Sequence, residues 1–309
     1  MLIFRDGGTS VPWILFYHLA SAILVTQRGR SICDAMKDFN AAVAFIPCQE
    51  EVPPRYRPLT EFLLVILAGL TGVCKSTVIA SLRAKLSFTL LPNRREITDE
   101  VIIRSLQQED DYPPAQVSDR VKRFEYTARY RARHPGGMAH ALSRLFVDST
   151  HAGSLLLFDG LRGLNEVQHA ATSFPQAYFI VLDASDTVRL ARLLKRADSF
   201  DTTSLTASSG GQTMLTALTA IQDIAAVFSR EQLHQISQAA NAAALPVDEV
   251  VKRATVIVEE RRNYDPITTR AYLTSNLSPE QVLIIDTATQ PPEAVTAQAT
   301  EWLNYQMRK

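Results

Sequence analysis

One unit of the sequence constrains the fold more than any other part. A continuous apolar run over residues 62–68 (FLLVILA) leads into a glycine-containing loop and then into a helix-compatible segment at residues 75–86. A run without polar interruption is typical of a central strand of a parallel sheet, because helices cover both faces of such a sheet. The unit therefore predicts a buried β-strand, a tight turn and an α-helix in succession.

Further apolar runs repeat this pattern along the chain. They cover residues 154–158, 178–182 and 282–285, and helical stretches follow them at residues 165–172, 187–195 and 291–306. Apolar strands that alternate with helices form βαβ units and a buried parallel sheet. We therefore predict an α/β fold.

Two long segments with helical patterns interrupt this alternation, at residues 93–149 and 199–276. The second begins with a Ser/Thr/Gly-rich stretch and continues into a part in which four apolar residues are spaced to share one helical face: Leu218, Ile221, Ala225 and Phe228. Helical inserts of this kind carry acceptor sites and lids in many enzymes. We expect both segments to be inserts of the main domain.

The N-terminal part of the chain ends in a Pro- and Arg-rich stretch, residues 52–58 (VPPRYRP), which predicts a linker. We therefore expect an N-terminal extension of uncertain role over residues 1–60. The main domain, with both inserts, is expected to cover residues 61–309.

Composition limits the partners and the compartment. Lys plus Arg and Asp plus Glu both number 32, so there is no net charge to draw the chain to nucleic acid, and we expect no stable nucleic-acid partner. The three cysteines form no C-x-x-C pair, which fits a reducing compartment and predicts a cytoplasmic protein. The apolar run at residues 11–25 is shorter than the roughly 20 residues that span a bilayer, so we expect no membrane role.

The loop after the first strand fits the phosphate-binding pattern G-x-x-x-x-G-K-[ST] at every position except the second glycine, where Cys74 stands. Backbone N–H groups of such a loop converge on phosphate oxygens at the N-terminus of the following helix. We therefore predict that the loop binds ATP, through the residues Gly69, Thr71, Gly72, Val73, Cys74, Lys75, Ser76 and Thr77.

Three of these residues have specific expected roles. Lys75 is expected to bridge the β- and γ-phosphates as a catalytic residue, and the Ser76 hydroxyl is expected to ligate Mg²⁺. A glycine at the position of Cys74 would let the backbone approach the phosphate without a Cβ atom, so we expect Cys74 to weaken binding without abolishing it.

A carboxylate follows the second long apolar run, in the segment 155–160 (LLLFDG). Ligands of open α/β sheets bind at the carboxyl ends of the strands, where Asp159 would lie. Asp159 is therefore predicted to be a functional residue, either holding Mg²⁺ through water or acting as the base on an acceptor hydroxyl.

Arginines at helical spacing are candidates for contacts with phosphate. Arg189, Arg192 and Arg196 lie three and four residues apart, and such an array can clamp a transferring phosphoryl group. We predict catalytic roles for Arg192 and Arg196. A solvated helix face is the alternative for any single one of them.

Two further basic segments are predicted to hold the acceptor. Arg94 and Arg95 follow a short strand-like run at residues 88–91 and lead into a helix, a position suited to an anionic acceptor. Residues 118–134 form a basic amphipathic helix that ends before Pro135, and Arg129 on it is predicted to contact a phosphorylated substrate.

The loop and three other segments resemble the P-loop nucleotide and nucleoside kinase group, in particular dephospho-CoA kinases and the related archaeal adenylate-kinase-like proteins. The other segments are 158–162 (FDGLR) with 165–167 (NEV), 181–184 (VLDA) with 189–196 (RLARLLKR), and Tyr130-Arg131 with 135–139 (PGGMA). The similarity covers about residues 62–197.

This resemblance implies a P-loop NTPase fold with three α/β/α layers and a five-stranded parallel sheet in the order 2-3-1-4-5. It also implies ATP with Mg²⁺ as donor, a lid after the helix at residues 187–195, and a substrate-binding role for Arg162. The segment 199–276 is longer than the usual lid of the family, so the resemblance does not identify the acceptor.

Three functions fit these features. The first is a phosphotransferase that moves the γ-phosphoryl group of ATP to a small-molecule, nucleotide-like acceptor. The second is a nucleotide-binding regulatory ATPase or switch whose helical insert binds a protein partner. The third, a polynucleotide-end kinase, is disfavoured by the zero net charge. The sequence leaves the acceptor and the oligomeric state open.

Overall fold

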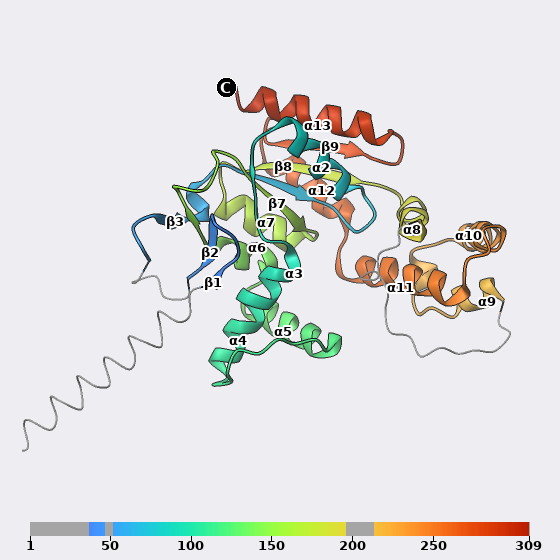
Figure 1. Ribbon diagram of the computed structural model, residues 1–309. Helices are drawn as coiled ribbons and strands as arrows, with labels where there is room; N and C mark the ends of the chain where they lie inside the picture. The colour runs from blue at the N-terminus through green and yellow to red at the C-terminus, as the bar shows by residue number, and fades with distance from the viewer. Residues whose placement is uncertain (1–36, 47–51, 196–212, 309) are drawn as a thin grey trace, which may run out of the picture.

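The computed structural model describes residues 37–46, 52–195 and 213–308. A five-stranded parallel sheet forms its centre (Figure 1). Its strands lie in the order β5 (Thr89–Leu90), β7 (Leu156–Leu161), β4 (Leu64–Ala68), β8 (Tyr178–Asp183) and β9 (Val282–Asp286). Numbered along the chain, this order is 2-3-1-4-5. The predicted α/β class and strand order are therefore confirmed.

Helices cover both faces of this sheet and make three layers. One face packs against α2 (Lys75–Lys85) and α13 (Pro292–Gln306), which Figure 1 shows together on one side. The other face packs against α6 (Gly137–Ser143), α7 (Leu164–Ser173) and α12 (Pro266–Asn276).

Strand β4 shows why its sequence is apolar throughout. Leu64, Ile66 and Ala68 pack into the cluster on the α7 side, whereas Val65 and Leu67 pack into the cluster on the α2 side. Successive side chains of a strand point to opposite faces, so a strand covered on both faces needs apolar residues at every position. This central strand delivers the glycine-containing loop to the carboxyl edge of the sheet.

The first insert forms a group of helices beyond that edge. It contains α3 (Arg94–Ile97), the π-helix η3 (Thr98–Ile103), α4 (Arg104–Glu109) and α5 (Arg120–Arg133). Helix α5 begins where the Asp119 side chain accepts a hydrogen bond from the Lys122 backbone N–H, and it ends before Pro135, because the residue that precedes a proline disfavours the helical conformation. The helix expected over residues 118–134 is therefore confirmed.

A small antiparallel sheet lies beside the parallel one. Its strands are ordered β1 (Lys37–Asp38), β2 (Val43–Phe45), β6 (Leu145–Asp148) and β3 (Tyr56–Pro58). The prediction that residues 52–58 form a linker was wrong for Tyr56–Pro58. Pro58 is compatible with a strand here because β3 lies at the edge of the sheet, where a missing N–H donor leaves no ladder bond unmade. The short 3₁₀ turn η2 (Leu59–Glu61) then leads into β4.

A second helical group follows β8. It contains α8 (Asp186–Leu194), α9 (Met214–Thr219), the 3₁₀ turn η5 (Ile224–Ala226), α10 (Arg230–Ala242) and α11 (Val247–Asn263). In Figure 1 these helices lie together at the right, and a shared apolar cluster holds them there.

The prediction that residues 218–228 share one helical face was wrong. Helix α9 ends at Thr219, and Asp223 adopts the left-handed conformation, with φ of 62°, which breaks the helix. Leu218 and Phe228 are still buried in the shared cluster. Ile224 is buried there instead of Ala225, and the Ala225 side chain is exposed.

Within the described ranges, no helix is both long and apolar enough to cross a bilayer. The apolar run at residues 11–25 and the Ser/Thr/Gly-rich stretch at residues 199–211 lie outside those ranges.

Candidate active site

The loop between β4 and α2 has two residues, Gly72 and Cys74, in the left-handed backbone region. Gly72 has φ of 88°, and a Cβ atom there would lie 3.0 Å from the Arg189 carbonyl oxygen, so only glycine fits. Cys74 has φ of 65°, in the left-handed region that disfavours residues with a Cβ atom. The cysteine therefore occupies a glycine conformation, and the loop keeps its shape at a cost in backbone strain.

Lys75 points back over this loop. Its Nζ atom donates to the Gly69 carbonyl at 3.0 Å and to the Leu70 carbonyl at 2.9 Å, and lies 4.0 Å from Asp159 Oδ1. Burial lowers the pKa of Lys75 to about 8, although the neighbouring Asp159 opposes this shift. The ammonium group is thus held at the loop by two carbonyl groups, with Asp159 as a longer ion-pair partner.

Asp159 lies at an irregularity in the sheet. Leu67 pairs with Asp159 but the next residue, Ala68, pairs with Leu161, so Gly160 is skipped in the register. Such bulges re-aim side chains near functional sites. Asp159 Oδ1 is buried and accepts no hydrogen bond, and burial raises the pKa of this carboxyl group, which Lys75 and Arg162 partly offset.

The surroundings of Asp159 fit Mg²⁺. Among the described residues no three His, Cys, Asp or Glu side chains gather as a ready metal site. Mg²⁺ needs no such cage, because it is usually bound by one or two protein oxygens together with phosphate oxygens and waters. The Asp159 Oδ1 atom, which accepts no hydrogen bond, and the Ser76 hydroxyl fit that pattern, because both residues line the same cavity.

Glu260, at the C-terminal end of α11, binds the loop from the second helical group. Its carboxylate accepts hydrogen bonds from the Thr71 N–H at 3.0 Å and the Thr71 hydroxyl at 2.6 Å. It also pairs with Arg162 at 2.8 Å and with the fully buried Arg189. Burial would raise the pKa of Glu260, but these two arginines and Thr71 lower it. The group is therefore a fixed anion that holds the side of the phosphate loop.

A second charge cluster lies around Arg94. Its guanidinium group makes two parallel bonds to the Glu166 carboxylate, at 2.6 and 2.8 Å, and also donates to the Gly160 carbonyl and the Tyr264 hydroxyl. Burial alone would lower the pKa of Arg94, but Glu166 raises it. Glu166 accepts a further bond from the Arg162 N–H at 3.0 Å. Arg94 is thus a fixed cation at the wall of the site.

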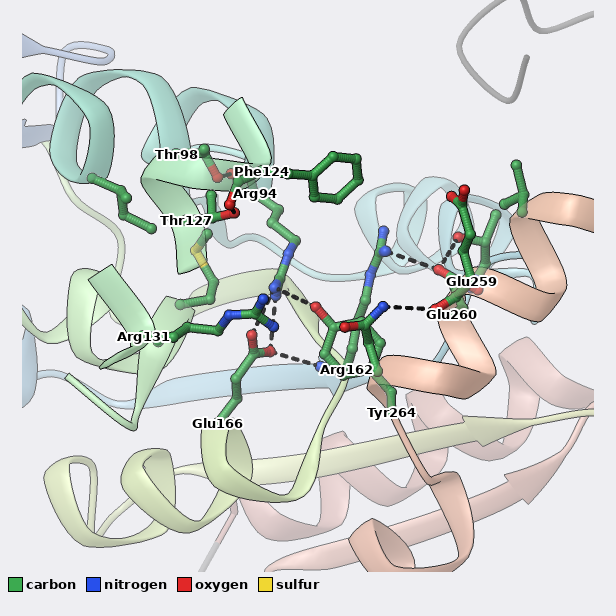
Figure 2. Close-up of a pocket in the computed structure, with 16 residues that line it drawn as sticks. Arg94, Thr98, Phe124, Thr127, Arg131, Arg162, Glu166, Glu259, Glu260 and Tyr264 are labelled. Atoms are coloured by element: carbon green, nitrogen blue, oxygen red, sulfur yellow. Dashed lines mark hydrogen bonds and ion pairs between the residues drawn. The ribbon is translucent and has the colours of Figure 1, made fainter. Parts of the chain in front are cut away.

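These groups line two adjoining cavities. The first, here the loop pocket, has a volume of about 450 Å³ and is lined by Gly72, Lys75, Ser76, Asp159 and the 93–95 segment. The second, here the insert pocket, has a volume of about 370 Å³ and lies between α5 and α11 (Figure 2). Thr71, Arg94, Thr98 and Arg162 line both cavities, so the two meet beside the phosphate loop.

The structure brings most of the sequence-predicted residues together. The residues that line the loop pocket include predicted phosphate, metal and acceptor ligands: Thr71, Gly72, Lys75, Ser76, Arg94, Arg95, Asp159 and Arg162. Arg192 lies behind the loop, where it donates to the Gly72 carbonyl and to Thr287.

Arg129 is not brought to the site. Arg129 lines neither pocket, because its guanidinium group pairs with Asp110 at 2.8 Å on the outer side of α5. Arg196 lies outside the described residues. The spacing of basic residues in the sequence therefore does not identify the face of α5 that lines the insert pocket. Arg131 lies on that face.

Sequence reasoning missed Glu260, Glu166 and Tyr264. Glu260 lies in a run of charged residues that looked like an ordinary helix end, and its partner Thr71 is 189 positions away. Glu166 belongs to the NEV segment, which follows FDGLR and is part of the family resemblance. That position is the signal that could have identified Glu166 as a site residue. No local pattern distinguishes Tyr264.

Comparison with known proteins adds a general likeness. No family model matches the chain, and no curated protein matches it. The chain resembles the solved structure of a sugar kinase from Janibacter sp. HTCC2649, with 13% identity and a TM-score of 0.36 over 79% of this chain and 95% of that one. It also resembles a gluconokinase from Sinorhizobium meliloti 1021, with 13% identity and a TM-score of 0.29 over 81% of this chain and 99% of that one.

A third likeness is to TT1252 from Thermus thermophilus, with 17% identity and a TM-score of 0.30 over 70% of this chain and 99% of that one. Similarities this distant carry no information about ligands or activity. The resemblance to dephospho-CoA kinases stays a prediction.

The Glu260 contacts give a first prediction. Glu260→Gln removes the charge that Arg189 and Arg162 share, so we expect the free energy of unfolding to fall by roughly 3 kcal/mol. The loss is not expected to be larger, because Arg189 keeps Asp186 as a partner. Urea denaturation would measure this. Glu301→Gln, at an exposed position of α13, is the control and should change stability by less than about 0.5 kcal/mol. Equal effects of the two substitutions would contradict the role of Glu260.

The conformation of Cys74 gives a second prediction. Cys74→Gly should stabilise the fold by up to about 1 kcal/mol, because relief of the left-handed strain exceeds the entropy that glycine adds to the unfolded chain. Cys74→Val should destabilise it by roughly 1–3 kcal/mol, because a β-branched residue fits this conformation poorly. Cys74→Ala, which keeps the Cβ atom, should change little. The idea fails if glycine and valine have the same effect on the urea midpoint.

The pKa of Lys75 gives a third prediction. Phosphate binds the ammonium form, and the free protein loses this proton as the pH rises through about 8. The affinity for an ATP analogue should therefore be constant near pH 7 and fall by up to about tenfold per pH unit above pH 8. Titration calorimetry from pH 6.5 to 9.5 would measure it. Lys75→Arg, which stays charged, should flatten the profile; a wild-type profile that is already flat would be incompatible with this pKa.

Proposed function

We propose that this chain transfers the γ-phosphoryl group of ATP to a small-molecule acceptor with the help of Mg²⁺, and that residues 61–309 carry this activity. The main support is that Lys75, Ser76 and Asp159 line one cavity together with Arg94 and Arg162. This cavity combines the glycine-containing loop, a carboxylate oxygen that accepts no hydrogen bond and two fixed cations. Phosphoryl transfer depends on positioning and on stabilising charge, and these groups supply both.

The donor would bind along the loop. The backbone N–H groups around Gly72 to Thr77 and the Lys75 ammonium group would hold the phosphates, and Lys75 would exchange its Gly69 and Leu70 carbonyl partners for phosphate oxygens. Ser76 and Asp159 would hold Mg²⁺, which would supply positive charge against the charge of the phosphates. Arg192, bonded to the Gly72 carbonyl, would position the loop, and Arg196 stays a candidate for contact with the transferring group.

The acceptor would reach the donor from the insert pocket. An oxygen of the acceptor forms a bond to the γ-phosphorus atom while the bond from that atom to the bridging oxygen breaks, and ADP leaves with the electron pair. Asp159 has an alternative role as the base: if Mg²⁺ is held by Ser76 and the phosphates without Asp159, the proton of an acceptor hydroxyl group would pass to Asp159. The raised pKa of Asp159 makes this carboxylate a better proton acceptor than an exposed aspartate.

A regulatory nucleotide switch is the second candidate function. It is favoured by the contact between Thr71 of the loop and Glu260 of the second helical group, because the state of the loop could bias the position of helices that bind a protein partner. Nucleotide binding without transfer to a small molecule would distinguish it. For either function we infer a cytoplasmic location from the cysteine usage.

Binding and turnover of ATP test the proposal. Calorimetry with a non-hydrolysable ATP analogue and Mg²⁺ should show binding that Lys75→Ala abolishes or weakens by at least about tenfold. Lys85→Ala, at an exposed position on the same helix, is the matched control and should bind as the wild type does. ADP release across a panel of nucleotides, nucleosides, sugars and dephospho-CoA should be stimulated by an acceptor.

Each result of this experiment has a definite meaning. Stimulated ADP release that needs Lys75 supports the phosphotransferase. Binding without stimulated release by any member of the panel favours the regulatory switch. A wild-type protein that binds no ATP analogue disproves both functions, and the conformation of Cys74 would then be the first cause to examine.

A further inference from the structure

Three imidazole rings meet where the first insert joins the helices that cover the parallel sheet. His134 directly follows α5, His140 lies on α6 and His169 lies on α7. The rings of His134 and His140 stack face to face, with centroids 4.0 Å apart and an interplanar angle of 9°. The ring of His169 meets that of His140 edge-on, at 5.5 Å. These three residues are here called the histidine cluster.

The cluster is not arranged as a metal site. In the described ranges, no three His, Cys, Asp or Glu side chains are placed to hold a metal ion. The rings instead pack against one another and against Tyr130 of α5, whose hydroxyl group lies 2.8 Å from His140 Nδ1. The cluster is therefore a packed contact between α5, α6 and α7.

His169 has no room and no acceptor for an additional proton. A Cβ atom on Gly136 would lie 2.4 Å from the His169 ring, so only a glycine lets the turn between α5 and α6 approach this ring. His169 Nε2 is buried and has no hydrogen-bond partner within the described ranges. An imidazolium group donates from both ring nitrogens, so a protonated His169 would bury an N–H group without an acceptor.

The charged groups around the cluster do not compensate for a positive charge on it. Arg133 of α5 and Arg144, which follows α6, are cations that act on the cluster. The carboxylate of Glu109 on α4 also acts on it, but this group pairs with Arg133. The carboxylate of Glu166 on α7 is held by Arg94. Protonated rings would therefore repel one another and the neighbouring arginines.

The three imidazoles are held in the neutral form at pH 7. Burial is the main cause that lowers the pKa of each ring, and the neighbouring histidines lower it further at His140 and His169. The effect is largest at His140, whose pKa falls to about 4. An uncharged cluster can keep its stacked arrangement.

Helix α5 has few other buried contacts. Of residues 122–133, only Tyr130 is buried. Three ion pairs also hold the helix: Arg123 with Asp99, Arg129 with Asp110, and Arg133 with Glu109. Ion pairs that reach solvent contribute little to stability, and a helix with few buried apolar contacts opens at a low cost in free energy. The attachment of the C-terminal end of α5 therefore depends on Tyr130 and the histidine cluster.

We propose that the histidine cluster is an acid-sensitive latch, which holds α5 against α6 and α7 at neutral pH and releases it when the imidazoles take up protons. Release separates the stacked rings and exposes them to water, where each can carry its charge. Helix α5 supplies Phe124, Thr127 and Arg131 to one wall of the insert pocket (Figure 2). Acid would therefore open this pocket on the side of the first insert.

The direction of the pH effect follows from the proton balance. An exposed histidine has a pKa of about 6.5, whereas His140 in the closed cluster has a pKa of about 4. The open form binds more protons between these two values, so a fall in pH favours it. From pH 7.5 to 5.0, His140 alone would raise the opening equilibrium by up to about thirtyfold. Exposed carboxylates stay ionised above about pH 5, so the ion pairs of α5 persist in this range.

Hydrogen exchange of the full chain at pH 7.5 and 5.0 tests the proposal. Protection factors are compared, because they remove the intrinsic pH dependence of amide exchange. Protection of the α5 amides should fall by about ten- to a hundredfold between the two pH values. At pH 5.0 the amides of β4 and β7 should stay at least about tenfold better protected than those of α5, which would show that the opening is local.

Variants assign the effect to the cluster. His140→Asn keeps a hydrogen-bonding group for Tyr130 but takes up no proton, so the fall in α5 protection should shrink by at least about fivefold. His234→Asn, at an exposed position of α10, is the matched control and should keep the wild-type fall. Each variant is compared with itself at two pH values, so a general loss of stability does not imitate the result.

Titration of the imidazole protons by NMR spectroscopy of the wild-type chain gives an independent measurement. His140 should titrate well below pH 6.5, with its signal identified by its loss in His140→Asn. Titration of His140 near pH 6.5 would overturn the proposal, as would an equal fall in α5 protection in His140→Asn and His234→Asn. Equal protection of α5 and β4 at pH 5.0 would also overturn it, because the whole chain would then unfold together. None of these measurements involves ATP, so their outcome is independent of the proposed function.

Discussion

The buried carboxylate of Glu260 is the contact on which the arrangement of the site depends. It joins Thr71 of the loop between β4 and α2, Arg162 directly after β7, and Arg189 of α8. A charge removed from water is tolerated when its hydrogen-bonding capacity is filled, and here two guanidinium groups, an N–H and a hydroxyl fill it. One side chain of the second helical group therefore fixes the loop, the strand end and the wall of the insert pocket relative to one another.

Two residues of the loop region are in unfavourable states: the backbone of Cys74 is strained, and the ammonium group of Lys75 is removed from water. Cys74 keeps the left-handed backbone that a glycine would adopt freely, and Lys75 is buried among carbonyl oxygens and a carboxylate 4.0 Å away. Neither state would persist in a flexible segment, because each costs free energy that only the surrounding packing can offset. The close contact of Gly72 with Arg189, together with the bond from Arg192 to the Gly72 carbonyl, supplies part of that packing.

The sequence predicted the elements and site residues that a local pattern of residues identifies. The continuous apolar runs located the long strands of the parallel sheet, and the strand order followed from the resemblance. The small sheet was missed because its strands have two to four residues, too few for a periodic pattern, and Pro58 argued against a strand. Around the loop, the pattern indicated Lys75 and Asp159, whereas Glu260 and Arg131 depend on contacts between distant segments and on which face of α5 turns inward. Such contacts leave no trace in a single sequence.

The small antiparallel sheet has a consequence for the order in which the chain folds. Strands β2 and β3 do not pair with each other; both pair with β6, which begins at Leu145, about 90 residues after Pro58 ends β3. A ribosome adds roughly 5–20 residues per second, so β6 follows its partners by roughly 5–20 seconds. During that interval the hairpin of β1 and β2 is the local pairing open to the nascent chain. The first insert must therefore be made before the small sheet can close.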